Sequence, residues 1–190
     1  MWLITGLGNP GPDYETHRHN IGFHAADAIA DSLNASTFRS KFQGSMAEAR
    51  CDEEKILILK PETYMNESGR SVQEAANFFK IPAERILVIH DELDLETGRM
   101  RIKFGGGHAG HNGLRSISRH LGTDDYWRIR IGIGHPGDKN KVHGYVLAPF
   151  SREEKTIAEK AVQAVADHIA LFLQGRPELF QTRATEAARG

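Results

Sequence analysis

Short apolar runs alternate along the chain with segments in which apolar residues recur at helical spacing. The runs predict strands at residues 2–7, 46–51, 55–60, 85–90, 99–104 and 128–134. The helical spacing predicts helices at residues 20–33, 67–80 and 110–121, and a long one that starts at a Ser151–Glu154 capping box. This alternation predicts an α/β fold: a single domain with a twisted, mixed, mostly parallel β-sheet flanked by helices.

The long helix is expected to end near Gly175 and Pro177. Its predicted core face consists of Ile157, Ala161, Val165, Ile169 and Phe172. Basic and apolar residues alternate in segment 99–104, which makes it the candidate for a half-exposed antiparallel strand. The domain is expected to span residues 1–190, and whether residues 177–190 are ordered or form a flexible tail stays open.

Ligands of open α/β sheets bind beyond the carboxyl ends of the strands. The loops predicted at that edge are 8–19, 61–66 and 91–98, with the glycine-rich loop 105–113 nearby. Candidate functional residues are therefore sought there.

Length and composition exclude several classes of protein. The 190 residues suffice for one domain, and no apolar run reaches the 18 or so residues of a membrane span. The first charge is Asp13, so no basic segment precedes an apolar stretch as in a signal peptide. The single cysteine, Cys51, excludes an internal disulfide and a multi-cysteine metal site. We therefore expect a cytoplasmic protein without a membrane partner.

Positive charge is concentrated in one segment. Residues 99–141 contain nine Lys/Arg and three Asp/Glu, while the chain as a whole has a net charge of −1. Such clustering is typical of proteins that bind phosphate-rich partners, although a solvated surface stripe is an equally good interpretation of the charge alone.

The glycines of the first loop, Gly6-x-Gly8-x-x-Gly11, match the dinucleotide fingerprint only weakly. That motif needs a helix to begin at the glycines, and Pro10 and Pro12 stand there instead. We interpret the segment as a rigid turn that presents Asn9, and dinucleotide binding remains a remote alternative.

Ten histidines are present, but no metal-binding framework such as H-E-x-x-H. A metal-free site needs only one histidine as general base and one carboxylate to orient it, and His19 and Asp91 can take these parts if their loops meet. A serine or cysteine nucleophile is disfavoured, because there is no G-x-S-x-G motif and Cys51 lies in a predicted strand. A metal-dependent hydrolase that uses the histidines stays open.

Asn9, Asn66 and Asn112 lie in predicted loops or at helix starts. Their amides could hold a peptide-like substrate or donate to a developing oxyanion. Asparagine is also common at turns and helix N-caps, so a purely structural role stays open for each.

Several segments together resemble the bacterial peptidyl-tRNA hydrolases. In chain order they are G-L-G-N-P-G from Gly6, R-H-N-I-G from Arg18, K-P-x-T-Y-M-N-x-S-G from Lys60, H-D-E-L-D from His90, G-G-G-H-x-G-H-N-G-L from Gly105 and R-I-G-I-G-H-P from Arg130. Each segment alone is moderately specific, but their combination and order over residues 6–150 are highly specific.

The resemblance implies a monomeric α/β esterase that frees tRNA from stalled peptidyl-tRNA without a metal or cofactor. It implies that His19 activates water, that Asp91 stabilises the imidazolium, and that Asn9 discriminates N-blocked from free aminoacyl esters. The residues implied to contact the tRNA and peptide parts of the substrate are Tyr14, Tyr64, Asn66 and Asn112, with Met65 in the same cleft.

The expected partner is then the acceptor stem and 3′ end of peptidyl-tRNA, and the basic segment is expected to hold phosphates of that stem, near the tRNA 5′ end, without reading bases. Arg101, Lys103 and Arg130 on the predicted strands are the candidates for this clamp, extended by Lys139 and Lys141. DNA is not an expected partner. A non-catalytic RNA-binding module would share the basic segment, but it would need neither His19 nor Asp91.

Overall fold

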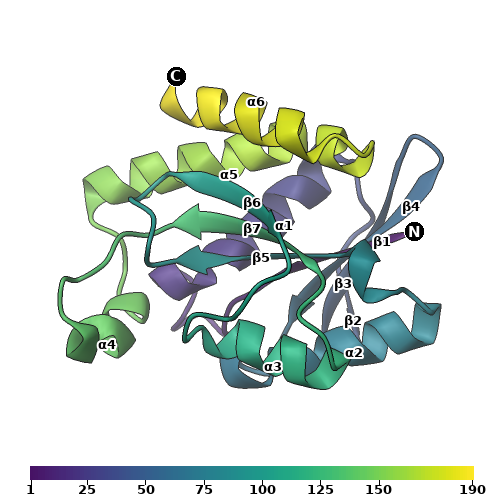
Figure 1. Cartoon of the computed structure of the whole chain (residues 1–190), viewed down its shortest axis with the longest axis horizontal. Coiled ribbons are helices and arrows are strands. Elements are labelled where there is room, and N and C mark those ends of the chain that lie inside the picture. The colour runs from purple at the N-terminus through teal and green to yellow at the C-terminus, as the bar shows by residue number, and fades with distance from the viewer.

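The computed structural model describes all residues, 1–190, and confirms the predicted α/β fold (Figure 1). The strands are β1 (Trp2–Gly6), β2 (Arg39–Lys41), β3 (Gly44–Cys51), β4 (Glu54–Pro61), β5 (Ile86–Glu92), β6 (Met100–Phe104) and β7 (Trp127–Gly132). The α-helices are α1 (Ile21–Ser32), α2 (Ser68–Phe79), α3 (Asn112–Leu121), α4 (Val142–Val146), α5 (Arg152–Leu173) and α6 (Pro177–Arg189). Short 3₁₀ helices are η1 (Arg18–Asn20), η2 (Met65–Glu67), η3 (Ala83–Arg85) and η4 (Lys139–Lys141).

The seven strands form one mixed sheet in the order β2-β3-β4-β1-β5-β7-β6. The four central strands β4, β1, β5 and β7 are parallel to one another. Strand β6 pairs antiparallel with β7, as its sequence suggests, and β3 pairs antiparallel with both β2 and β4. The carboxyl ends of the four parallel strands therefore meet at one edge, where the loops predicted to carry function emerge.

Helices cover both faces of the sheet (Figure 1). Helices α1, α5 and α6 lie on one face, and α2 and α3 lie on the other. Because successive strand residues point to opposite faces, Ile4 of β1 packs beneath α1 and α5, whereas its neighbour Leu3 packs beneath α2 and α3. The two hydrophobic cores fix the sheet and leave its carboxyl edge free for polar groups.

Helix α5 begins at the predicted capping box. Ser151 Oγ accepts a hydrogen bond from the Glu154 backbone N–H, and Glu154 in turn accepts one from the Ser151 N–H. The predicted core face is buried except at its first position, where Ile157 is 46% exposed. The prediction for Ile157 is wrong because this side chain packs on the turn at Gly98 instead of on the core.

Residues 177–189, whose order the sequence left open, form helix α6. Phe180 and Ala184 are fully buried, and Phe180 packs edge to face against Phe172 of α5. The Gln181 side chain accepts a hydrogen bond from the Ile102 backbone N–H, so α6 also attaches to the edge strand β6. The helical spacing of Phe180, Ala184 and Ala188 is the sequence signal that could have predicted this helix.

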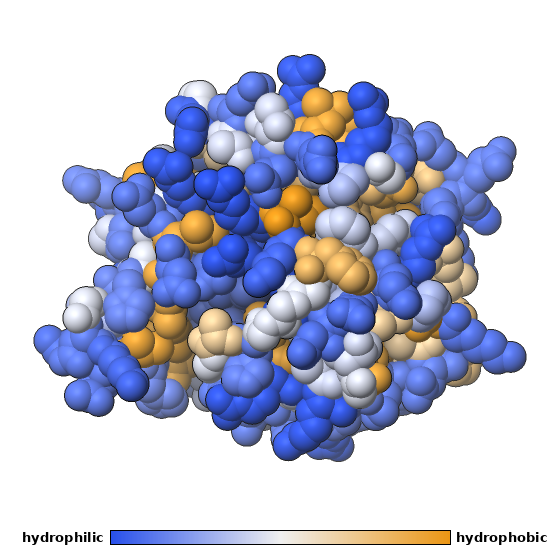
Figure 2. Space-filling view, viewed as in Figure 1, coloured by the Kyte–Doolittle hydropathy of each residue, from blue (hydrophilic) through white to orange (hydrophobic).

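Figure 2 shows a largely hydrophilic surface on the face seen in Figure 1, with apolar residues in small separate patches. None of the helices is both long enough and apolar enough to cross a membrane.

Candidate active site

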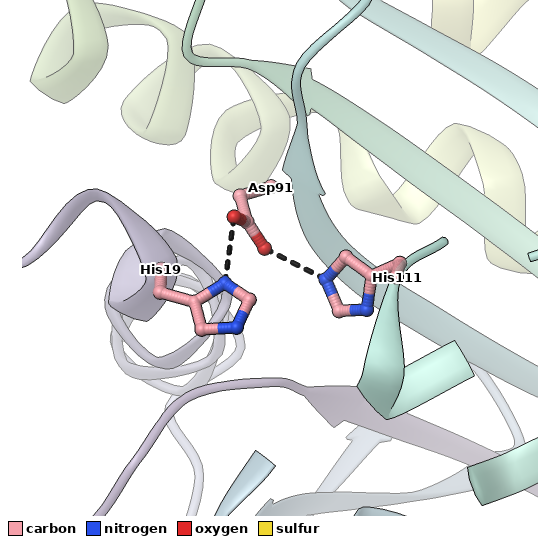
Figure 3. Close-up of side chains that lie close together, drawn as sticks. All are labelled: His19, Asp91 and His111. Atoms are coloured by element: carbon pink, nitrogen blue, oxygen red, sulfur yellow. Dashed lines mark hydrogen bonds and ion pairs between the residues drawn. The ribbon is translucent and has the colours of Figure 1, made fainter. Parts of the chain in front are cut away.

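His19, Asp91 and His111 meet at the carboxyl edge of the sheet (Figure 3). His19 comes from η1, Asp91 from the end of β5, and His111 from the N-cap of α3. The structure thus brings together the predicted pair His19 and Asp91. Asp91 was expected in the loop after its strand but lies within β5, paired with Ile131 of β7, so its backbone is held by the sheet.

Asp91 receives a hydrogen bond on each carboxylate oxygen. His19 Nδ1 lies 2.7 Å from Oδ2, and His111 Nε2 lies 2.8 Å from Oδ1. Burial by itself raises the pKa of the Asp91 carboxyl, but the two adjacent imidazoles and their hydrogen bonds hold that pKa well below its usual range. Asp91 is therefore a buried carboxylate that lies between two imidazoles and is ionised near neutral pH.

The backbone of α3 fixes the tautomer of His111. Its Nδ1 accepts hydrogen bonds from the N–H groups of Gly113 and Leu114, at 3.1 and 3.3 Å. Nδ1 therefore carries no proton, and Nε2 donates to Asp91. His111 thus donates to Asp91 through Nε2 and caps α3 through Nδ1, a role that the sequence reasoning did not assign to it.

His19 has the opposite arrangement. Because its Nδ1–H donates to Asp91, the other ring nitrogen, Nε2, carries the lone pair and points away from the carboxylate (Figure 3). Burial lowers the pKa of His19, but the Asp91 charge and hydrogen bond outweigh burial, so this pKa lies above its ordinary value of 6.5. The Nε2 atom is suited to take a proton from a water molecule.

His90 lies beneath the pair as an uncharged support. Its Nδ1 donates to the Asp91 backbone oxygen at 2.8 Å, and its ring packs edge to face on His111. Complete burial is the main cause that lowers the pKa of His90, to about 3. His90 therefore adds no charge to the site near neutral pH.

Asn9 is held in a single orientation beside this cluster. Its Oδ1 accepts from the Met65 N–H at 2.7 Å, and its backbone N–H and C=O both bond to the Asn20 side chain at 2.9 Å. The Asn9 Nδ2 group has no protein partner and is available to a substrate. Asn20, which the sequence reasoning missed, is thus the residue that positions Asn9.

The four predicted contact residues lie around this edge. The Tyr14 and Tyr64 rings are 6.1 Å apart between centroids. Asn66 and Asn112 are exposed, and neither caps the helix that follows it, because the N-caps of α2 and α3 are Glu67 and His111. The structural interpretation of these two asparagines as N-caps is therefore wrong. Met65 is buried and packs against Gly113: a Cβ atom added to Gly113 would lie only 2.7 Å from Met65 Sδ.

Basic side chains line one face of β6 and β7. On one face of these strands, Met100, Ile129 and Ile131 pack into the core that includes α5 and α6. Because side chains alternate along a strand, Arg101, Lys103 and Arg130 point to the opposite face. Arg101 is paired in register with Arg130. Arg101 and Lys103 are exposed and have no anionic partner within 4.0 Å. Arg130 differs from the other two, because its Nε donates to Glu92 Oε1 at 2.7 Å.

Two further basic groups occupy other positions. Lys139 and Lys141 lie in η4, both exposed. Arg128, which sequence reasoning did not single out, is buried and donates to the Gly106 and Gly107 carbonyls at 2.6 Å each. Arg128 therefore anchors the glycine-rich loop that leads to His111.

The cluster of His19, Asp91 and His111 offers three ligand atoms within 4.8 Å of one another. A metal ion bound to His111 Nε2 would need that nitrogen without its proton, while two backbone N–H groups already occupy Nδ1. The ring would have to leave the α3 cap or become an imidazolate. The geometry therefore fits a hydrogen-bonded acid–base pair better than a metal centre.

Comparison with known proteins agrees with the geometry. Residues 3–189 match the family model described as peptidyl-tRNA hydrolase. The chain is 55% identical to the peptidyl-tRNA hydrolase of Azorhizobium caulinodans over 97% of this chain and 90% of the relative, and 54% identical to that of Acidiphilium cryptum over 96% and 95%. A crystal structure of peptidyl-tRNA hydrolase from Acinetobacter baumannii superimposes with a TM-score of 0.92 at 38% identity, covering 97% of this chain and 94% of that one. The resemblance inferred from the motifs is thus confirmed, and this chain belongs to the peptidyl-tRNA hydrolase family.

Proposed function

We propose that this protein hydrolyses the ester bond of peptidyl-tRNA, releasing free tRNA and an N-blocked peptide and so recycling tRNA from stalled or dropped-off translation products. The family supports the substrate class. The observation that carries the mechanism is the free Nε2 of His19, whose Nδ1–H is bonded to the buried carboxylate of Asp91.

In the proposed reaction, His19 Nε2 takes a proton from a water molecule as the water oxygen attacks the ester carbonyl carbon. Asp91 balances the positive charge of the resulting imidazolium. When the tetrahedral intermediate breaks its bond to the ribose oxygen, His19 returns the proton to that oxygen. Ester, water and His19 account for every atom, so no cofactor or metal is required, and a general base of this kind contributes about 10²–10⁴ in rate.

The amides around His19 suit the substrate carbonyls. The Oδ1 atom, the backbone N–H and the backbone C=O of Asn9 are all bonded within the protein, so Nδ2 is the group left for the substrate. Asn9 is proposed to donate from Nδ2 and to distinguish N-blocked from free aminoacyl esters. Asn66 and Asn112 have side chains free to contact the peptide or the 3′ nucleotide. Tyr14 and Tyr64 are proposed to border the same substrate.

The face of β6 and β7 is proposed to bind phosphates of the acceptor stem. Arg101 and Lys103 supply charges without internal partners, and Arg130 contributes less because of Glu92. Since every residue of the site comes from one chain, we propose that a monomer acts, in the cytoplasm where bacterial translation takes place.

The test is the hydrolysis of N-acetyl-aminoacyl-tRNA beside the unblocked aminoacyl-tRNA, with chelator in both reactions. We expect cleavage of the blocked ester only. His19→Ala is expected to lower kcat by about 10²–10⁴ while tRNA affinity stays unchanged. His168→Ala on α5 is the matched control and is expected to retain full activity.

Other outcomes would favour the other functions. Activity that disappears only with chelator would indicate a metal-dependent hydrolase. A folded protein that binds tRNA and cleaves neither ester would be an RNA-binding module.

A further inference from the structure

A groove of about 500 Å³ opens next to Asn9. It lies between the loop after β1, the first turns of α1 and the carboxyl end of β4. Asn9 and Asn20 form its inner end, and its outer lining includes Glu15, Phe23 and Glu62. The volume lies in the range of sites that bind small molecules or short peptide segments.

The order of the strands places this groove opposite the basic face. Asn9 follows β1, and Asp91 ends the neighbouring strand β5. From β5 the sheet continues through β7 to β6, which carries Arg101 and Lys103, whereas on the other side of β1 it continues to β4, which ends at the groove. A substrate held at His19 and Asn9 can therefore extend its polynucleotide towards β6 and its peptide towards β4.

The groove is negatively charged. Its one lysine, Lys60, pairs with Asp27 at 2.6 Å, so these two charges compensate each other. Glu15 and Glu62 have no cationic partner within 4.0 Å, and Glu62 accepts only from the Ser45 hydroxyl. The remaining titratable side chain, His24, bonds through Nε2 to the Glu15 backbone oxygen. Two carboxylates are thus uncompensated, which disfavours phosphates in the groove.

We propose that this groove binds the peptide residues that precede the esterified one, and that Glu15 and Glu62 make it select a basic side chain over an acidic one there. The inference rests on the proposed function and deepens it. Phe23 offers an apolar contact to the peptide that does not depend on its charge. Because the groove is open to solvent, the selection is modest and weakens with salt.

The test compares tRNA esterified with N-acetyl-Lys-Phe, N-acetyl-Glu-Phe and N-acetyl-Gln-Phe, with N-acetyl-Phe-tRNA as reference. In 50 mM salt we expect kcat/KM for the Lys substrate to exceed that for the Glu substrate by about three- to tenfold, mainly through KM. In the double variant Glu15→Gln/Glu62→Gln, the ratio is expected to approach one. Glu84→Gln, an exposed carboxylate at the amino edge of the sheet, is the control and retains the wild-type ratio.

Two results would overturn the proposal: equal kcat/KM values for the Lys and Glu substrates in the wild type, or a preference that persists unchanged in the double variant. Failure to hydrolyse even N-acetyl-Phe-tRNA would refute the proposed function instead. The reference substrate therefore separates the two failures.

Discussion

At the scale of single residues, the site depends on one carboxylate shared by two histidines with different roles. His111 accepts backbone N–H groups of α3 at Nδ1 and donates to Asp91 from Nε2, whereas His19 presents its free nitrogen away from the carboxylate. The hydrogen bond from His111 stabilises the negative charge of Asp91 and so moderates how strongly Asp91 raises the pKa of His19. His111 is in this sense a positioning residue for the proposed base, His19.

His111→Asn tests that role, because asparagine also caps helices but is too short to reach Asp91. Only unprotonated His19 can act as base, so kcat/KM rises with pH through the pKa of His19, above 6.5. Without the donor from His111, Asp91 attracts the His19 proton more strongly. The acidic limb of the pH profile is then expected to move to higher pH, by about one unit or less.

The measurement is kcat/KM for N-acetyl-aminoacyl-tRNA between pH 5 and 9, with the melting temperature as a control of folding. His111→Ala, which removes the cap as well, is expected to destabilise the protein by about a further 1 kcal/mol. An Asn variant with reduced rates but an unmoved acidic limb would show that His111 only supports the fold.

The sequence motifs predicted His19, Asp91 and Asn9, because these residues lie in loops or at strand ends where chemistry is expected. His111 and Asn20 were missed. Their roles depend on partners far along the chain, such as Asp91 for His111 and Asn9 for Asn20. No local spacing shows which of ten histidines will cap a helix and face a buried carboxylate.

At the scale of elements, hydrophobic periodicity predicted six of the strands and four of the helices, because these bury a continuous face. Strand β2 has three exposed residues and α4 has one buried residue, so neither has an apolar pattern to recognise. Helix α6 does have apolar residues at helical spacing, but only Phe180 among them is large, and the helix is ordered by contacts with α5 and β6.

Helix α6 is predicted to contribute substantially to stability. Phe180→Ala removes a fully buried ring next to Phe172 and is expected to lower the free energy of unfolding by about 3–5 kcal/mol. Urea unfolding followed by circular dichroism measures this loss. Thr182→Ala, at an exposed position of the same helix, is the control, and equal stability of the two variants would contradict the packing of α6.

At the scale of the whole molecule, positive and negative charge are separated along the carboxyl edge of the sheet. The basic face of β6 and β7 lies on one side of Asp91, and the acidic groove at β4 lies on the other side of Asn9. This division matches a substrate with a polyanionic half and a peptide half. The net charge of −1 does not show this separation of charge, whereas the clustering of basic residues in 99–141 indicates it in the sequence.

The basic face yields a prediction about tRNA binding, because each phosphate contact releases counterions. Arg101→Ala and Lys103→Ala are each expected to weaken tRNA binding and to reduce the slope of log Kd against log salt by about one. Arg130→Ala is expected to change the slope less, because Glu92 already neutralises part of its charge. Fluorescence anisotropy with labelled tRNA between 50 and 200 mM salt provides the slopes.

Lys160→Ala on α5 is the control for this series, since its side chain is exposed on the helix that packs against the opposite face of the sheet. An equal change in slope for Lys160→Ala would mean that net charge alone governs binding. If the slopes of log Kd against log salt are unchanged in the Arg101 and Lys103 variants, the acceptor stem binds elsewhere. Lys139 and Lys141 of η4 would then be tested next. Because none of these side chains is hydrogen-bonded or ion-paired to His19 or Asp91, kcat at saturating substrate should stay near the wild-type value, which separates a loss of tRNA binding from a loss of chemistry.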